Sequence, residues 1–355
     1  MPTLPAFWHA AATLSGRLDL SHAVQTHRGR LSQLTGAQLT QLGITPAHIQ
    51  RLARGTPLHH APPFVTLDDP EYPQALRPVP YAPPVLFWEG NLTLLSVSPK
   101  TAIVGSRRCT SDGMRMARSL ARAAAAHGGV VVSGLAWGID TAAHLAAPAQ
   151  TIAVLGEGLL NPKSRAAQRT TQTILSSGGL VLSEFLPTWP ASKHTFPLRN
   201  RVIAGLCELT VVVEAAQRSG AGITARLALE AGREVGAVPG SPYATASQGC
   251  LLLLSQGAAL IRDPSDMLSL LGTVTHPAAA AQPSAHPVVS ALQPGGSTFD
   301  ELVQRTKIPP GALGAMLGAL ELQRIIHRLP GDRFPRRTTS SFGDPFASEP
   351  SHGSE

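Results

Sequence analysis

The sequence feature that most constrains the fold is the stretch 101–113, in which a short apolar run at 101–104 is followed at once by a glycine loop, with a helix-forming segment directly after it. The run Thr-Ala-Ile-Val at 101–104 is rich in β-branched residues, which is typical of a buried strand. Residues 114–127 contain neither glycine nor proline and predict a helix. A strand, a glycine loop and a helix N-terminus direct backbone N–H groups at an anion. The segment therefore predicts a phosphate-binding loop.

The same alternation of strand and helix continues to about residue 262. Strands are expected at 101–104, 130–133, 152–155, 180–183, 209–214, 235–238 and 259–261, and helices at 114–127, 139–147, 163–177, 200–207, 221–233 and 245–256. Continuous apolar strands separated by helices predict an α/β fold with a doubly wound, Rossmann-like parallel sheet. Ligands bind at the carboxyl ends of such strands, where the sequence places Gly105, Gly134, Gly156, Glu184 and Glu214.

The segments outside this alternation predict smaller modules. Residues 1–62 carry leucines at helical intervals and predict a helical, SAM-like module, in which a helix-hairpin-helix at 34–44 and a plain packing role both stay open. Residues 63–271 form an extended Rossmann-like domain, whose proline-rich beginning holds one short strand at 85–88. A linker at 272–287, a winged-helix-like domain at 288–337 and a disordered tail at 338–355 complete the predicted organisation.

The winged-helix prediction depends on two helices followed by a β-hairpin. Thr298 is expected to cap a helix that begins at Phe299, with Glu301 three residues on. A second helix follows the Pro-Pro pair at 309–310, and residues 324–327 and 333–334 predict a two-stranded wing. Because the second helix, GALGAMLGALELQ, carries almost no base-reading side chains, a protein contact or a structural role is favoured over DNA reading.

Composition and charge narrow the class of partner. The formal charge of +7 and pI of about 9.9 favour a polyanion. The three cysteines, Cys109, Cys207 and Cys250, share no metal-ligand spacing, which indicates a reduced chain without a metal site. No signal peptide and no apolar run near the roughly 20 residues of a membrane helix are found. The chain is therefore expected to be cytoplasmic and soluble, with no membrane partner.

The first candidate binding motif is Gly105-Ser106-Arg107, with Arg108 beside it. A guanidinium matches a phosphate with two parallel hydrogen bonds, so this loop predicts a phosphate cradle. The alternative is an ordinary strand-to-helix turn with solvated arginines.

The second candidate lies in residues 193–201, KHTFPLRNR. Lys193, Arg199 and Arg201 bring three positive charges into one turn-rich segment, and Phe196 offers a ring on which a base can stack. Cations interleaved with an aromatic ring in a loop suit single strands better than a duplex. The alternative is that Phe196 and the following proline only pack against a helix that begins near Asn200; both roles can hold in part.

Three further features have a structural alternative. Asp140 and His144 are four residues apart, but a helix cap at Asp140 and a packed His144 are favoured over a metal or acid–base pair. The Ser-Gly-Ala-Gly-Ile-Thr segment at 219–224 opens a helix and either binds phosphate or allows close packing. Glu184 and Glu214 end strands, where carboxylates most often accept hydrogen bonds from neighbouring backbone N–H groups.

Signatures of several enzyme classes are missing. The Gly-Glu-Gly at 156–158 begins like a dinucleotide fingerprint, but position 161 is Asn. The chain has no Walker A Lys-Ser/Thr pair, and Ser133 does not lie in a G-x-S-x-G elbow. These absences leave catalytic residues, cofactors and metals unassigned.

Taken together, the ordered motifs resemble the DNA-processing protein A (DprA/Smf) family. The matching segments are EYPQAL, IVGSR, VSGLAWGIDTAAH, TIAVLG, LSEF, TFPLRNRVIAGL, VVVEA, SGAGITARLALEAGR and AVPG. They run from residue 71 to residue 240, and the likeness extends to residue 258. Two departures are the GEGLLNPKSRAAQ segment, where the family commonly has Tyr-Pro, and Leu251, where it often has Asn.

The resemblance implies a bacterial recombination mediator that binds and shields single-stranded DNA in natural transformation and helps to load the RecA recombinase. It also implies a homodimer built through the Rossmann-like domain. In the family, the Gly-Ser-Arg loop and the Lys-x-x-Phe segment carry DNA, and these roles map onto Gly105, Ser106, Arg107, Lys193 and Phe196. Asn200 and Arg201 are added here as phosphate or structural contacts.

Two other classes of function stay open at this point. The fold family also resembles LOG-type enzymes, which cleave nucleoside monophosphates at the N-glycosidic bond and place a glutamate just after the Thr of PGGxGTxxE. Here Thr224 is followed by Ala, Arg and Leu, which favours binding over catalysis. A protein-interaction scaffold with incidental DNA contacts would bind its partner independently of salt.

Overall fold

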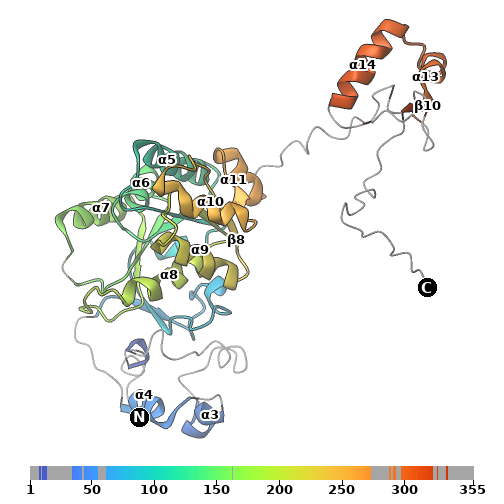
Figure 1. Cartoon of the computed structure of the whole chain (residues 1–355). Coiled ribbons are helices and arrows are strands. Elements are labelled where there is room, and N and C mark those ends of the chain that lie inside the picture. Colours follow the sequence, from blue (N-terminus) through green and yellow to red (C-terminus); the bar gives the residue numbers. More distant parts are fainter. Residues whose placement is uncertain are drawn as a thin grey trace, which may run out of the picture. The chain divides into compact units, whose positions relative to one another are not determined.

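The computed structural model describes residues 8, 10–13, 34–41, 44–54, 61–161, 163–272, 288, 291–292, 297–322, 326 and 333–334. The chain divides into two compact units, residues 1–274 and 275–355, shown in Figure 1. The predicted linker beyond residue 272 and the predicted tail lie outside the described residues.

The first unit is built on a sheet whose described strands follow the order β1-β2-β6-β5-β4-β3-β7-β8-β9. The neighbouring strands from β6 to β9 in this order are all parallel. Their bounds are β3 Lys100–Val104, β4 Val130–Ser133, β5 Thr151–Leu155, β6 Leu180–Ser183, β7 Leu209–Val212, β8 Glu234–Ala237 and β9 Ala259–Leu260. The sequence prediction of a doubly wound parallel sheet is confirmed.

Helices cover both faces of the sheet, which explains why successive residues of its inner strands are buried and mostly apolar instead of alternating with exposed polar residues. Along β3, Ala102 and Val104 pack into one hydrophobic cluster, whereas Ile103 between them packs into a second cluster. The bounds of the helices are α5 Ser111–Ala126, α6 Ile139–Ala146, α7 Arg165–Ser176, α8 Thr195–Leu206, α9 Gly220–Glu230, α10 Gln248–Ser255 and α11 Pro264–Leu270. Residues of α5, α6 and α11 fill the cluster around Ile103, and α7, α8, α9 and α10 supply the other (Figure 1).

Helix α8 begins earlier than the sequence predicts. The predicted start near residue 200 is wrong, because the helix begins at Thr195. The hydroxyl of Ser192 accepts hydrogen bonds from the backbone N–H groups of His194 and Thr195. Pro197 lies in the first turn, where a helix needs no N–H donor. Phe196 and the following basic residues are therefore helical instead of lying in a loop.

The proline-rich segment before β3 contributes two antiparallel strands to the sheet. The predicted strand is β2, Val85–Gly90, which pairs with β6, and it is joined by β1, Phe64–Thr66, which the sequence pattern does not predict. The rings of Phe64 and Phe87 meet edge to face, with their centroids 5.8 Å apart. Short 3-10 helices are η2 Gln74–Leu76, η3 Leu92–Leu95 and η4 Thr245–Ser247.

Before residue 62 the structure describes the short helices α3 Gly36–Gln41 and α4 Pro46–Arg54, together with helical residues at 8 and 10–12. In the second unit it describes β10 Ser297–Thr298, α13 Phe299–Thr306, α14 Pro310–Leu322 and β11 Arg333–Phe334. The predicted capping box of Thr298 and Glu301 is present. Strand β11 pairs with β10. The predicted pairing of 333–334 with 324–327 stays a prediction, because most of the latter segment lies outside the described residues.

Candidate nucleic-acid interface

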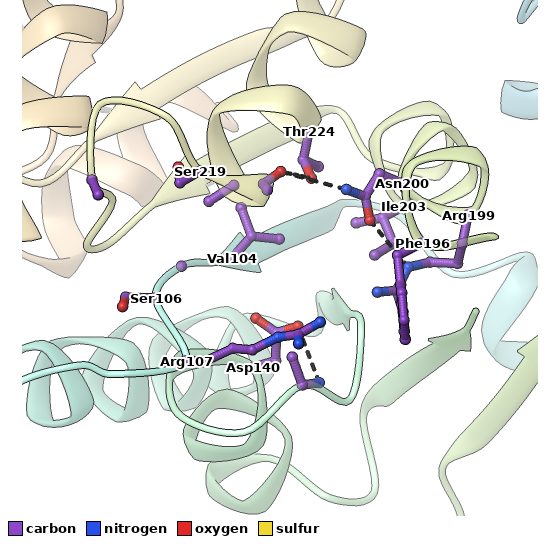
Figure 2. A pocket seen from close by; sticks show the side chains of 15 residues that line it. Val104, Ser106, Arg107, Asp140, Phe196, Arg199, Asn200, Ile203, Ser219 and Thr224 are labelled. Atoms are coloured by element: carbon purple, nitrogen blue, oxygen red, sulfur yellow. Dashed lines mark hydrogen bonds between the residues drawn. The ribbon is translucent and has the colours of Figure 1, made fainter. Parts of the chain in front are cut away.

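A cavity lies at the carboxyl edge of the sheet, where the strand order reverses. From β3 the chain winds outward through β4, β5 and β6, then returns to β7 on the other side of β3. Such a switch point is where doubly wound sheets bind ligands. The cavity has a volume of about 260 Å³ and is lined by the loop after β3, the loop before α6, the first turns of α8 and the beginning of α9 (Figure 2).

Arg107 and Phe196, both predicted site residues, meet at this cavity. The guanidinium carbon of Arg107 lies 5.3 Å from the centroid of the Phe196 ring, which is within the range of a cation–π contact. Figure 2 shows the Arg107 side chain extending toward the ring. Arg107 is exposed and Phe196 is half-buried, so both can be reached by a ligand. The structure thus joins the two predicted motifs in one place.

Glycine at 156 makes room for the Phe196 ring. A Cβ atom at Gly156 would lie 2.7 Å from Phe196 Cδ1. The glycine at the end of β5 therefore serves close packing of an aromatic side chain, and the same reasoning applies at Gly105, where a Cβ would lie 2.7 Å from Ile139 Cγ1.

The backbone of the Gly-Ser-Arg loop is largely engaged by the protein. The Ser106 N–H donates to the carbonyl oxygen of Glu214 at 2.8 Å, and the Arg108 N–H donates to Ser106 Oγ at 3.0 Å. The prediction that phosphate is cradled by these loop amides is therefore unsupported for Ser106 and Arg108. The side chain of Arg107 lines the cavity together with Gly105 and Ser106.

The N-terminus of α5 is closed by the carboxylate of Glu214. Its Oε2 accepts from the Thr110 N–H at 2.9 Å, its Oε1 accepts from the Thr110 hydroxyl, and a Cβ at Gly113 would lie 2.5 Å from its Cδ. A negative group at a helix N-terminus is what the helix dipole favours. The anion that the sequence predicts for this helix is thus supplied by the protein itself.

Asp140 is a buried carboxylate that holds the loop before α6. Its Oδ2 accepts from the N–H groups of Gly134 and Ala136 at 3.1 and 3.3 Å. Burial raises the pKa of Asp140, and the positive charge of Arg199 opposes that rise. The prediction that Asp140 caps its helix is wrong, because the N-cap residue is Gly138.

His144 is a packed core residue, as predicted. Its Nδ1 lies 2.7 Å from Thr151 Oγ1, which itself donates to the carbonyl oxygen of Val131, so Nδ1 is the donor to Thr151. Burial lowers the pKa of His144 to about 3. No group of three or more metal-ligating side chains occurs among the residues that the structure describes.

Arg199 lines the cavity and links the loop after β4 to the end of β5, a role that the sequence pattern does not predict. The side chain is 4% exposed and donates to the carbonyl oxygens of Gly134, at 2.7 Å, and Val154. Its Nε donates to Asn200 Oδ1 at 3.1 Å, and burial lowers its pKa to about 10. The helical spacing of three between Phe196 and Arg199 is the signal that could have placed both on one face.

Asn200 and Arg201 follow Arg199 in α8 but differ in surroundings. Asn200 lines the cavity, and its Nδ2 donates to the carbonyl oxygen of Gly220 at 3.4 Å. Arg201 is buried, and both of its terminal nitrogens donate to the carboxylate of Glu184 at 2.6 Å. Its Nε donates to the carbonyl oxygen of Tyr81 at 2.9 Å. Of the two roles left open for Arg201, these contacts match the structural one.

Lys193 and Arg108 are exposed outside the lining of the cavity. Lys193 lies in the turn before α8, and Arg108 lies in the loop before α5. Both side chains are therefore cations of the protein surface outside the cavity. Gly220 and Thr224 of α9 also line the cavity, as does Ser219, whose Oγ caps this helix by accepting from the Gly222 N–H.

Comparison with known proteins identifies the family. Residues 63–272 match the family described as DNA recombination-mediator protein A, and residues 274–332 match the DprA winged helix domain. The chain therefore belongs to the DNA recombination-mediator protein A (DprA/Smf) family, as the motifs predict.

Individual relatives agree with this assignment. Protein Smf of Synechocystis sp. is 33% identical over 78% of this chain and 80% of its own length. DNA processing protein DprA of Streptococcus pneumoniae is 45% identical over 59% of this chain and 73% of its own length. The solved structure of the Streptococcus pneumoniae protein covers 76% of this chain and 98% of that chain, with 34% identity and a TM-score of 0.65. A second solved structure is that of DNA processing protein A from Helicobacter pylori, which describes its single-stranded DNA binding mode. It covers 59% of this chain and 96% of that chain, with 29% identity and a TM-score of 0.55.

Among the helices that the structure describes, none is long and apolar enough to cross a membrane.

Proposed function

We propose that the protein is a recombination mediator that binds single-stranded DNA at the cavity of Arg107 and Phe196. The observation that carries the proposal is the placement of the Arg107 guanidinium 5.3 Å from the Phe196 ring at the carboxyl edge of the sheet. An aromatic face beside a cation is the combination that binds a base and its phosphate. The single-stranded DNA binding described for the Helicobacter pylori relative supports the same partner here.

The geometry favours a single strand over a duplex. Bases of a duplex are stacked on one another, so their faces cannot reach the Phe196 ring, whereas bases of a single strand can turn outward. Arg107 then takes a phosphate through its guanidinium, while the exposed cations Arg108 and Lys193 attract the phosphates on either side. Asn200 and Arg199 hold the walls of the cavity. Gly105 and Ser106 fix the loop that carries Arg107.

A binding role is favoured over catalysis. Asp140 is the one carboxylate among the described residues that line the cavity, and its Oδ2 already accepts two backbone hydrogen bonds. Ala225, Arg226 and Leu227 follow Thr224 on α9, so the position of the LOG-type glutamate, three residues after the Thr, is occupied by Leu227. The proposal accordingly includes no catalytic residue, cofactor or metal.

The family membership extends the proposal to partners. The protein would shield incoming single strands in the cytoplasm during natural transformation and help to load RecA onto them. It would work as a homodimer through the Rossmann-like domain, because two linked cavities on one strand raise the affinity through effective concentration. For the second unit we propose a protein contact or a structural role, since α14 offers few side chains that read bases.

The experiment that tests the site is fluorescence anisotropy with a labelled oligonucleotide, single- and double-stranded, over a salt series. Arg107→Ala and Lys193→Ala should each weaken binding to the single strand and lower the salt slope by about 0.7 for each phosphate that the variant no longer neutralises. Arg122→Ala is the matched control, because Arg122 is an exposed arginine of α5, about three turns from the helix N-terminus. Equal binding of duplex and single strand, unaffected by Arg107→Ala, would place the DNA site elsewhere in the chain.

A further inference from the structure

Trp137 is an exposed indole in the loop that precedes α6. The side chain is 67% exposed, whereas the described Trp8 is buried and Trp189 is 39% exposed. Most of the indole therefore makes no contribution to the core, and the fold gains little from a tryptophan at this position. A large aromatic face held in solvent is the feature that single-strand binding proteins present to bases.

The loop around Trp137 is held by hydrogen bonds on both sides of the indole. The two hydrogen bonds to Asp140 hold Gly134 and Ala136, and the Thr141 N–H and hydroxyl both donate to the Ala136 carbonyl oxygen, at 3.1 and 2.7 Å. Leu135, with φ +58°, adopts the left-handed region that a bulky residue rarely enters. An aromatic side chain on a fixed loop loses little conformational freedom when it binds.

The same loop is packed against the loop that carries Arg107. Gly138 has φ +91°, and a Cβ there would lie 2.4 Å from the Ser106 carbonyl oxygen and 3.0 Å from that of Arg107. The Ile139 N–H donates to the Ser106 carbonyl oxygen. Ala136 and Asp140, which flank Trp137 in sequence, line the same cavity as Phe196. The backbone of Arg107 is therefore next to the turn of Trp137, while its guanidinium reaches Phe196.

We propose that Trp137 is a second base-stacking platform, which binds a base of the single strand outside the cavity. The proposal rests on the proposed function, because it continues the strand whose phosphate is held by Arg107. The order is then ring, cation, ring: one base stacks on Phe196, the phosphate binds Arg107, and another base stacks on Trp137. Alternation of this kind binds single strands of any sequence, since every base has a π face.

The direct test measures binding of a labelled oligo(dT) by anisotropy and, separately, quenching of tryptophan fluorescence. Trp137→Ala should weaken binding about tenfold, within the range of about 5- to 150-fold for loss of one stacked base. Trp137→Phe should retain most of the affinity but lose most of the quenching. Leu145→Ala, at a 47% exposed position of α6, is the control for removal of apolar surface, and Trp189→Phe is the control for the fluorescence signal.

A strand with the same phosphates but no bases separates stacking from loop structure. Wild type and Trp137→Ala should bind this abasic strand equally; an equal penalty on both strands would mean that Trp137 acts through the loop, which would overturn the proposal. Unchanged affinity and unchanged quenching in the Trp137 variants, with binding still weakened in Arg107→Ala, would overturn the stacking role of Trp137 alone. Absence of salt-dependent single-strand binding in wild type would overturn the proposed function and the platform together.

Discussion

The arginines around the cavity fall into two groups with opposite surroundings. Arg199 and Arg201 of α8 are 4% and 6% exposed and donate to carbonyl oxygens and to the Glu184 carboxylate. Arg107 and Arg108 of the loop after β3 are exposed, and the Arg107 side chain lies against the ring of Phe196. The buried group holds segments of the protein together, whereas the exposed group is available to a ligand.

Positive charge near a binding site is therefore not by itself evidence of a DNA contact. A buried guanidinium must have its donors satisfied by the protein, since unpaired buried charge is costly. Substitutions in the buried group should therefore change the stability of the fold, and substitutions in the exposed group should change the affinity for DNA with little effect on stability. Variants of either group test this division.

The largest effect is expected for Glu184→Ala. The substitution leaves the Arg201 guanidinium buried without the carboxylate that accepts from both of its terminal nitrogens. Breaking a buried pair by removing one partner costs about 3–5 kcal/mol in the free energy of unfolding. Urea denaturation followed by circular dichroism measures this change.

A double variant provides the control for this prediction. Glu184→Met combined with Arg201→Met removes both charges and should restore much of the stability, because a packed apolar pair can replace a buried ion pair. A destabilisation below about 1 kcal/mol for Glu184→Ala would show that Arg201 is not a structural residue, and a DNA contact by Arg201 would then need testing.

A smaller effect is expected from the pH dependence of His144. Its pKa is about 3 in the folded protein, against 6.5 without burial. The unfolded chain therefore binds a proton below pH 6.5 that the folded protein excludes, so stability is present above 6.5 and is lost as the pH falls. The loss should be about 1.4 kcal/mol per pH unit, or about 2 kcal/mol at pH 5.

The measurement is the difference between the stability curves of wild type and His144→Asn. Asparagine keeps a donor for Thr151 and cannot titrate. Asp140, whose pKa is raised by burial, acts in the opposite sense but is present in both proteins and cancels in the difference. Parallel curves from pH 7 to pH 5 would contradict a buried neutral His144.

The fold was predictable because its signals are local and repeated. Strands at 130–133 and 180–183 have the bounds expected from their apolar runs. Strand β1 was missed because three residues give too short a pattern; its place is fixed by pairing with β2, which is a long-range contact. The early start of α8 was missed because Pro197 suggests a break, although proline fits the first turn of a helix.

The site was predictable only in part, because two similar segments have different neighbours. The beginnings of α5 and α9 both follow a strand of the parallel sheet, and both have glycine close by, in the loop before α5 and in the first turn of α9. Glu214 reaches the first of these and closes it, whereas Ser219 and Gly220 of the second line the cavity. The strand order decides which helix N-terminus lies next to a carboxylate. The strand order is a long-range property, so it cannot be predicted from either segment alone.

The next prediction separates the ring of Phe196 from the charge of Arg107. Phe196→Leu removes the aromatic face but retains most of the volume, so binding to oligo(dT) should weaken about tenfold. The salt slope should stay as in wild type, because the substitution removes no charge. Anisotropy over a salt series measures both quantities.

Gly156→Ala is the matched variant for this prediction. Its Cβ would meet the Phe196 ring at 2.7 Å, so it should displace the ring and reproduce the weaker binding without changing Phe196 itself. Unchanged affinity in both variants would leave Phe196 as a packing residue, which is the alternative that the sequence leaves open.

The smallest effect is expected for Arg108→Ala. Arg108 is exposed beside Arg107 but does not line the cavity, so its interaction with phosphate is screened by water and salt. The affinity should fall by less than about fivefold, and the salt slope by no more than about 0.7, with the preference for single strands retained. A reduction as large as that of Arg107→Ala would mean that the strand follows the outer surface of the loop, because two neighbouring arginines would then contribute equally although Arg107 is the one that reaches the Phe196 ring.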